Sequence, residues 1–231
     1  MSQAIVTGTS SGIGRAVAEQ MMRDGWFVHG IDQHPAVISG AGFKAWQVDL
    51  SMASEIDRLL DDLLATIQPK ALVHAAGLLR VGSVDELHAA DGAAMWHVHV
   101  DAAVRLGHRV LPIMRQAGHG RVVFIGSRVA SGMPGKSLYA ASKSALITLA
   151  KSWAAECIHD GVTVNVVSPA ATDTAMLHDP ARQTSTPRVP PIGRLIQAQE
   201  VADLVAFLTR PQSAAITGQD WVICGGASLS S

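Results

Sequence analysis

Short apolar runs alternate along this chain with longer segments of helical periodicity, and this alternation constrains the fold more than any other feature. Seven runs are predicted to be strands: residues 4–7, 27–31, 45–48, 71–75, 121–125, 162–167 and 221–223. Helical periodicity marks residues 12–24, 52–67, 92–116, 137–159 and 199–208. The pattern predicts one α/β domain over residues 1–231: a Rossmann-type, doubly wound parallel sheet of about seven strands, with helices on both faces.

Glycine and proline set the expected ends of these segments. Gly25 ends the first helix, Pro69 stops the second, and Pro112 predicts a kink or break near the end of the long helix at 92–116. Residues 170–193 are irregular and rich in proline. Long loops inside compact domains are often functional, so this segment is predicted to be a substrate loop or lid.

Composition narrows the functional classes. The 231 residues carry a net charge of −1 without a block of like charge, which gives no case for nucleic acid or an anionic membrane as partner. The apolar runs are far shorter than a bilayer span, and the first residues do not read as a signal peptide. Cys157 and Cys224 stand far apart, which favours a reducing compartment and a cytoplasmic location. The ten histidines lack metal-binding spacing, so no metal is expected.

A glycine-rich turn follows the first predicted strand directly: Thr7-Gly8-Thr9-Ser10-Ser11-Gly12-Ile13-Gly14. Glycines here permit a tight turn and let the backbone approach a pyrophosphate, which the N–H groups of the next helix would face. The spacing differs from the better-known Gly-x-Gly-x-x-Gly fingerprint. Its place between strand and helix indicates nucleotide binding, although such a turn also has purely structural uses.

The second predicted strand leads into Asp32, which lies 24 residues after Gly8. This is close to the offset of about 20 residues at which an acid bonds a ribose 2′-hydroxyl. A carboxylate there repels a 2′-phosphate, and neither lysine nor arginine occurs among residues 33–35 or immediately before Gly12. The sequence therefore predicts NAD rather than NADP as cofactor, the alternative being that Asp32 only begins a turn.

The single tyrosine of the chain, Tyr139, precedes Lys143 by four residues. Four residues span about one helical turn, so the two side chains share a face if this segment is helical. A phenol has an ordinary pKa of about 10, and a nearby ammonium lowers it. The pair is a candidate general acid/base, although the same spacing also occurs on solvated helix faces.

Together these motifs resemble the short-chain dehydrogenase/reductase family over essentially the whole chain. The turn at 7–14 is similar to its cofactor loop, Asp49 and Leu50 to its adenine contact, and Ser127 to its catalytic serine. Tyr139 and Lys143 are similar to its catalytic pair. The family's nicotinamide-anchoring segment and its C-terminal pattern are matched by Ser168, Pro169, Thr172 and Thr174, then by residues 216–219 and 224–226.

The resemblance implies an NAD-dependent oxidoreductase that interconverts a secondary alcohol and a carbonyl by hydride transfer. Tyr139 would exchange the proton with the substrate oxygen, Lys143 would hold the ribose and lower the tyrosine pKa, and Ser127 would donate a hydrogen bond to that oxygen. The expected cofactor-binding residues are Gly8, Ser10, Ser11, Gly12, Ile13, Gly14, Asp32, Asp49, Leu50, Ala75, Ala76, Gly77, Tyr139, Lys143, Pro169, Thr172 and Thr174.

Three departures from the family pattern stand out. The usual Asn-Asn-Ala-Gly begins with His74-Ala75 here, the usual helix asparagine aligns with His99, and the usual Pro-Gly is Pro169-Ala170. In the family that asparagine helps hold a water that links the lysine to solvent. Imidazole can donate, accept and titrate near neutrality, so His99 is expected to serve as a catalytic residue in its place. The alternatives are an impaired site and a histidine that only packs inside the helix.

Two other functional classes remain open. One is a catalytically impaired nucleotide-binding or sensing protein on the same fold, and the other, less favoured, is a sugar-nucleotide epimerase or dehydratase, which needs more C-terminal sequence. The substrate is expected to be a small alcohol or ketone. Adjacency to the motifs gives candidate pocket residues Leu78, Leu79, Arg80, Arg128, Met133, Met176 and Leu177. Arg128 directly follows Ser127, which suggests an anionic group on the substrate unless it is a surface arginine.

The chain is also expected to associate with copies of itself. The predicted helices around residues 95–113 and 137–157 are more apolar than one covered face requires. Members of the family commonly pair through these helices, so the sequence predicts a homotetramer or homodimer. Burial within the monomer is the alternative.

Overall fold

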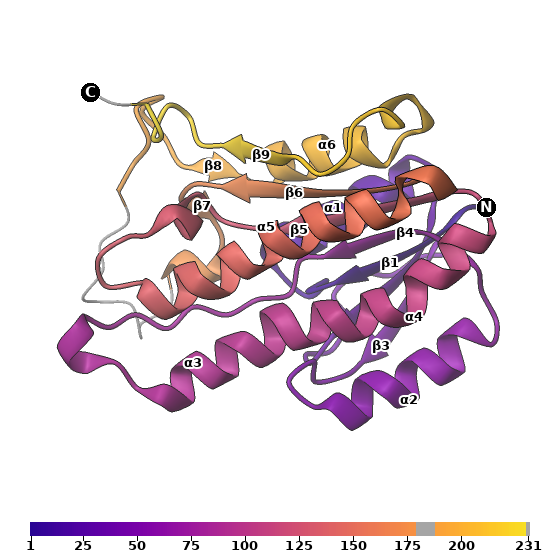
Figure 1. The fold of residues 1–231 in the computed structure, drawn as a ribbon, viewed down its shortest axis with the longest axis horizontal. Coiled ribbons are helices and arrows are strands. Elements are labelled where there is room, and N and C mark those ends of the chain that lie inside the picture. The colour runs from indigo at the N-terminus through magenta and orange to yellow at the C-terminus, as the bar shows by residue number, and fades with distance from the viewer. Residues whose placement is uncertain (179–187, 230–231) are drawn as a thin grey trace.

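The computed structural model describes residues 1–178 and 188–229, and a seven-stranded parallel sheet forms their centre (Figure 1). The strands lie in the order β3-β2-β1-β4-β5-β6-β9. Their bounds are β1 Gln3–Thr7, β2 Phe27–Asp32, β3 Phe43–Gln47, β4 Pro69–His74, β5 Gly120–Ile125, β6 Val162–Pro169 and β9 Asp220–Ile223. The predicted doubly wound sheet is confirmed.

Helices cover both faces of the sheet (Figure 1). On one face lie α2 (Ala53–Leu64), α4 (Ala102–Gln116) and α5 (Ser137–Cys157), and on the other α1 (Gly12–Arg23) and α6 (Ala198–Thr209). Every residue of β5 and β6 is buried, because each strand is covered on both sides. The apolar runs without alternation therefore correspond to the central strands.

Two proline predictions need correction. Helix α2 ends at Leu64, before Pro69, and Pro69 is instead the first residue of β4. A proline is tolerated at the start of a strand, where its missing N–H costs no ladder hydrogen bond. Pro112 lies inside α4, which continues to Gln116, so the predicted break there is wrong.

The interruption of the long helix lies earlier than predicted. The helix α3 (Ala89–Trp96) passes into a π-helical turn, His97–Asp101, before α4 begins. A π-helical turn widens the backbone hydrogen-bonding step to five residues and frees carbonyls for other donors; such turns are frequent at functional sites. His99 lies in this turn and is fully buried.

The strand order sets the position of the candidate site. From β1 the chain proceeds outward to β2 and β3, then returns to β4 on the opposite side of β1. In such a sheet the connections diverge at the carboxyl ends of the two central strands, and ligands bind in the crevice this creates. The segments after β1, β4, β5 and β6 all begin at this edge.

The predicted loop at 170–193 is partly ordered into secondary structure. A short strand β7 (Thr172–Asp173) pairs in parallel with β8 (Ile196–Gln197), and a 3-10 turn occupies Ala175–His178. Residues 179–187 of the predicted lid lie outside the described residues, so the lid stays a prediction.

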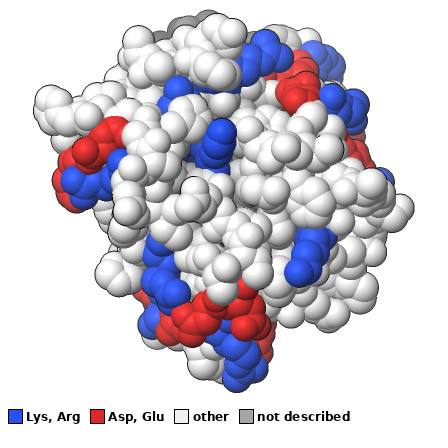
Figure 2. Space-filling model, turned by 90° about the vertical axis from the view of Figure 1, so that its right-hand side faces the viewer, with Lys and Arg blue, Asp and Glu red and all other residues white. Residues whose placement is uncertain are grey.

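The surface near the amino ends of the strands carries basic and acidic side chains interspersed with uncharged ones (Figure 2). Among the described residues, none of the helices combines the length and apolar character that crossing a bilayer requires. Cys157 and Cys224 are both free thiols.

We predict that the protein is a homodimer or homotetramer, because bulky apolar side chains stay exposed on the first of the two helices named for pairing, which the structure divides into α3 and α4. Trp96 on α3 is 43% exposed and Val104 on α4 is 40% exposed. Val104→Glu is expected to shift the mass measured by light scattering toward smaller species. Val84→Glu, at an exposed site in the turn Val84–Glu86, is the control and should leave the mass unchanged. A monomeric wild type at micromolar concentration would contradict the prediction.

Candidate active site

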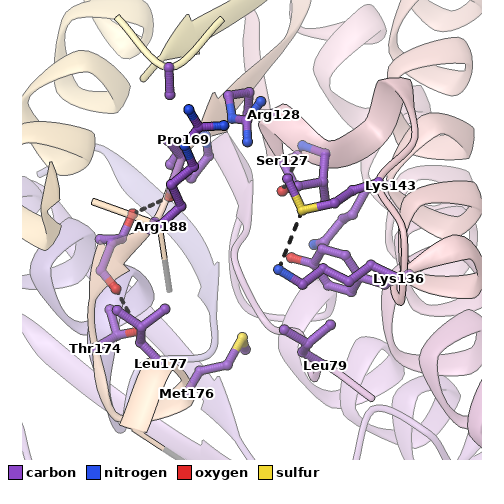
Figure 3. A pocket seen from close by; sticks show the side chains of 18 of the residues that line it. Leu79, Ser127, Arg128, Lys136, Lys143, Pro169, Thr174, Met176, Leu177 and Arg188 are labelled. Carbon is purple, nitrogen blue, oxygen red and sulfur yellow. Dashed lines mark hydrogen bonds between the residues drawn. The ribbon is translucent and has the colours of Figure 1, made fainter. Parts of the chain in front are cut away.

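A cavity of about 760 Å³ lies at the carboxyl edge of the sheet and is bordered by Ser127, Tyr139 and Lys143 (Figure 3). Ser127 follows β5, and the other two lie one helical turn apart on α5. Because residues four apart share a helix face, the tyrosine and the lysine face the cavity together. The fold thus brings three residues from two segments to one place.

Lys143 is buried, with 4% of its surface exposed. Its Nζ donates a hydrogen bond to the carbonyl of Ile125 at 2.9 Å and lies 5.7 Å from the centre of the Tyr139 ring. Burial disfavours the ammonium and lowers the pKa of Lys143 to about 7. The amine can therefore gain or lose a proton near neutral pH.

Ser127 precedes the 3-10 turn Arg128–Ser131 and caps it. Its Oγ accepts a long hydrogen bond, 3.4 Å, from the backbone N–H of Val129. An acceptor role leaves the hydroxyl proton available for a substrate oxygen.

The glycine turn after β1 packs too tightly for side chains. Gly8 has φ +77°, and a Cβ on it would lie 2.9 Å from the backbone nitrogen of Ala76. A Cβ on Gly14 would lie 2.2 Å from the carbonyl oxygen of Gly8. The glycines therefore hold the first turn of α1 against the segment after β4. Ser11 makes no side-chain cap at the start of α1, so its side chain leaves the first N–H groups of the helix uncapped.

Asp32 holds the backbone around the glycine turn. Its carboxylate accepts hydrogen bonds from the N–H of Ser10 at 3.0 Å and from the N–H of His34 at 2.9 Å. Each carboxylate oxygen has more than one lone pair, so both can still accept a bond from a ribose hydroxyl. Asp49 likewise accepts from the N–H and Oγ of Ser51, each at 2.8 Å.

The predicted cofactor residues divide into two groups. Those bordering the cavity are Ile13, Ala75, Gly77, Tyr139, Lys143, Pro169, Thr172 and Thr174. Those lying outside its lining, at the end of β2 or in the segments after β1, β3 and β4, are Gly8, Ser10, Ser11, Gly12, Gly14, Asp32, Asp49, Leu50 and Ala76. The second group follows the sheet edge away from the cavity, as an extended dinucleotide would.

His99 lies beneath the cavity, next to both members of the pair on α5. Its ring meets the Tyr139 ring edge-on with centroids 5.6 Å apart. A Cβ placed on Gly77 would lie 3.0 Å from His99 Nε2 and 3.5 Å from Lys143 Nζ. Burial, with Lys143 as the second cause, holds the pKa of His99 well below its ordinary value, so the ring is neutral near pH 7.

Hydrogen bonds fix the tautomer of His99. Its Nε2 accepts from the backbone N–H of Leu78 at 3.0 Å, so the ring proton is on Nδ1 and is donated to Ser142 Oγ at 2.9 Å. Ser142 in turn donates to the carbonyl of Tyr139 at 2.8 Å. Both ring nitrogens are engaged by protein groups, which favours a positioning role over the proton relay that the sequence suggests.

His74 makes a second fixed set of contacts. Its Nε2 donates to the carbonyls of Val98 and His99, at 3.0 and 3.1 Å, and its Nδ1 accepts from Thr7 Oγ1 at 3.0 Å. The two carbonyls belong to the π-helical turn. Thr7 Oγ1 also accepts the N–H groups of Ala75 and Ala76. Hydrogen bonds therefore connect β1 through His74 to the π-helical turn, and the His99 ring in that turn connects through Ser142 to the backbone carbonyl of Tyr139.

Five of the seven predicted pocket residues line the cavity: Leu79, Arg128, Met133, Met176 and Leu177. Leu78 and Arg80 do not; Arg80 pairs with Asp91 at 3.7 Å. Sequence reasoning missed two cationic lining residues, Lys136 and Arg188 (Figure 3). Lys136 stands three residues before Tyr139 and its spacing was a usable signal, whereas nothing in the sequence marks Arg188.

Comparisons with known proteins agree with this geometry. The family model described as Enoyl-(Acyl carrier protein) reductase matches residues 8–228. The chain is 35% identical to "3-oxoacyl-[acyl-carrier-protein] reductase FabG" of Escherichia coli (strain K12), covering 96% of each protein. It is 34% identical to "2,3-dihydro-2,3-dihydroxybenzoate dehydrogenase" of the same organism, covering 97% of this chain and 96% of that one.

Solved structures of dehydrogenases are also similar to this chain over nearly its whole length. A "short chain dehydrogenase/reductase family protein" superposes with a TM-score of 0.89 at 30% identity, covering 99% of this chain and 98% of that one. A "4-hydroxyisoleucine dehydrogenase complexed with NADH" has a TM-score of 0.90 at 25% identity, covering 100% of both chains.

Proposed function

This chain belongs to the short-chain dehydrogenase/reductase family of oxidoreductases, and on that premise we propose that it interconverts a secondary alcohol and a carbonyl with NAD. The observation that carries the proposal is the convergence of Ser127, Tyr139 and Lys143 on one cavity. A bound nicotinamide would exchange a hydride with the carbinol carbon of the substrate.

The chain's own residues would handle the proton. In alcohol oxidation Tyr139 takes the proton from the substrate oxygen as the hydride leaves the carbon, and in reduction it returns that proton. When Lys143 carries its proton, its positive charge stabilises the phenolate that forms one helical turn away, whereas burial lowers the pKa of the lysine itself to about 7. Ser127 donates a hydrogen bond to the substrate oxygen, where negative charge develops in the reaction.

His99 and Ser142 would act on the tyrosine as positioning residues. Their bonds run from the N–H of Leu78 to the carbonyl of Tyr139 and connect the segment after β4 to the first turns of α5. This orients the phenol relative to the cofactor site without contact with substrate.

The residues present fit a dinucleotide. Glycines without room for a Cβ bring the backbone close at the start of α1, whose N–H groups suit a pyrophosphate. Asp32 stands at the end of the next strand and suits a ribose 2′-hydroxyl. Ile13, Thr172 and Thr174 border the end where the nicotinamide would lie.

NAD is expected to bind at least about tenfold more tightly than NADP, which corresponds to about 1.4 kcal/mol. The Asp32 carboxylate would repel a 2′-phosphate, and none of residues 33–35 offers a compensating cation. The structural neighbour with NADH agrees with this direction. Equilibrium titrations with the two oxidised cofactors decide it, and a lower dissociation constant for NADP would contradict it.

The matched variants are Asp32→Ala and Asp32→Asn. Both remove the charge, but only the amide retains a side-chain oxygen for one of the two N–H groups that Asp32 now accepts. Both variants should narrow the difference between the dissociation constants for NAD and NADP. The melting temperature should change less in Asp32→Asn than in Asp32→Ala.

The proposed function is tested by an NAD-coupled screen of secondary alcohols that includes hydroxy acids, polyols, sterols and cyclic diols. Turnover that disappears in Tyr139→Phe supports it. Tight NAD binding without turnover of any alcohol or ketone would instead indicate a nucleotide-binding protein on this fold.

A further inference from the structure

The cavity is cationic on its walls. Four basic side chains border it: Arg128, Lys136, Lys143 and Arg188. Among the described residues that line it, none is an aspartate or glutamate. Figure 3 shows Lys136 and Lys143 on the side of Ser127 and Arg188 on the side of Thr174, with Arg128 near the top of the view. An anion in this space would meet positive charge from more than one wall.

Arg128 has a buried hydrogen-bond donor without an acceptor among the described residues. Its Nε is buried and has no hydrogen-bond partner, and within the described part of the chain its guanidinium makes no ion pair. Leaving a buried donor unpaired is unfavourable, and more so for a charged group. By contrast Arg105 and Arg109, on the outer side of α4, both bind aspartates of α2. Arg128 borders the cavity, so an anion bound there could accept a hydrogen bond from its unpaired Nε.

The geometry of arginine selects the acceptor. A guanidinium is a planar fork whose Nε and Nη hydrogens match the two oxygens of a carboxylate. Arg128 follows Ser127 directly, and consecutive α-carbons lie about 3.8 Å apart. Both side chains border the same cavity, so a carboxylate bound by Arg128 would share that cavity with the substrate oxygen that faces Ser127. Several other lining residues, including Leu79, Val129 and Met133, are apolar.

We infer that the substrate is a secondary alcohol or ketone that carries a carboxylate near the reacting carbon, with Arg128 as the residue that binds the carboxylate. This inference rests on the proposed function. Arg188 also lines the cavity and adds a second positive charge. The carboxylate takes no part in the hydride or proton transfer; it fixes the orientation of the carbinol against Tyr139.

The competing role for Arg128 is to neutralise the cofactor phosphates. The glycine turn follows β1, whereas Arg128 follows β5, two strands further along the sheet. Neighbouring strands are about 4.8 Å apart, so the two segments begin about 10 Å apart at the sheet edge. The position of Arg128 therefore favours a substrate carboxylate over the cofactor phosphates as its binding partner. The experiment below distinguishes these two roles.

The test compares hydroxy acids with their methyl esters and primary amides as substrates, with NAD and wild-type protein. The acids should show kcat/KM values about 10- to 100-fold higher, since hydrogen bonds to charged groups are worth about 1.5–3 kcal/mol. Arg128→Gln should abolish this preference by raising KM for the acid while the ester is unaffected, and Arg128→Lys should keep part of it. Arg80→Gln, outside the cavity, is the matched control and should retain it.

Each other outcome has a defined meaning. Equal loss for acid and ester together with weaker NAD binding would assign Arg128 to the cofactor and overturn the inference. A preference for phosphate esters over carboxylates would also overturn it. If no alcohol or ketone is turned over, the proposed function fails, but the carboxylate site can still be tested. Calorimetry that compares the binding of benzoate with that of benzamide then decides whether Arg128 binds a carboxylate. Tighter benzoate binding that is lost in Arg128→Gln but not in Arg80→Gln supports the site, and its absence overturns it.

Discussion

Replacing Tyr139 with phenylalanine is expected to lower kcat by about 10²- to 10⁴-fold, the range that proton-transfer groups contribute. The phenol is the one group at the cavity that we assign to proton exchange with the substrate oxygen. The ring remains to pack against His99, so the fold and the dissociation constant for NAD should change little. Steady-state kinetics, an NAD titration and a melting curve measure the three quantities. A Tyr139→Phe variant with more than a tenth of wild-type kcat would contradict the assignment.

The pH dependence of alcohol oxidation in Lys143→Met tests whether the lysine lowers the pKa of Tyr139. Because the pKa of Lys143 is about 7, the tyrosine–lysine pair should lose a proton near neutrality, and the rate of alcohol oxidation should rise through that range. Without the ammonium, the inflection should move upward toward the ordinary phenol value of about 10. The chain has one tyrosine, so phenolate absorbance reports Tyr139 alone. If the inflection of the pH–rate profile is unchanged in Lys143→Met, the lysine does not influence the proton transfer.

Lowering the pH from 6.5 toward 4.5 is expected to destabilise the fold strongly, because it holds buried neutral histidines. Burial lowers the pKa of His74 to about 4 and that of His99 well below 6.5. Between these values and 6.5 the unfolded chain binds protons that the folded chain does not, so the free energy of unfolding falls as the pH falls. From pH 6.5 down to about 4, His74 alone lowers the free energy of unfolding by about 3 kcal/mol.

Denaturant unfolding at several pH values measures this slope. His74→Asn and His99→Asn remove the titrating group but keep an amide, so each should flatten the dependence. His108→Asn, on the exposed side of α4, is the control and should leave it unchanged. Measurements above pH 4.5 avoid the Glu200 carboxylate, whose pKa the Arg194 guanidinium lowers to about 2. Equal slopes in wild type and both histidine variants would contradict the prediction.

The same variants separate positioning from structure alone. His99→Asn should retain most turnover, while His99→Leu, which loses the bonds to Leu78 and Ser142, should lower kcat with little change in NAD affinity. Unchanged kcat across pH in a folded His99→Leu protein would mean that the imidazole does not influence the tyrosine.

Local sequence patterns are enough to predict the helices and strands and the residue pairs within one helix. Apolar runs without alternation predict strands buried on two faces, and β5 and β6 are buried throughout, because burial on both faces removes the need for polar residues. Tyr139 and Lys143 could be placed on one helix face because helical periodicity is local. The glycine turn could be placed between strand and helix for the same reason.

Contacts between segments that are far apart in the sequence became visible only in the folded structure. The bonds of His74 reach Thr7, 67 residues earlier, and His99, 25 residues later, and local periodicity carries no information about such pairs. The π-helical turn at His97–Asp101 is another case, since His74 binds the carbonyls of Val98 and His99 within it. The basic lining of the cavity likewise appears only when the segments after β5 and β6 fold over one strand edge, which brings Arg188 to the cavity that Arg128 borders.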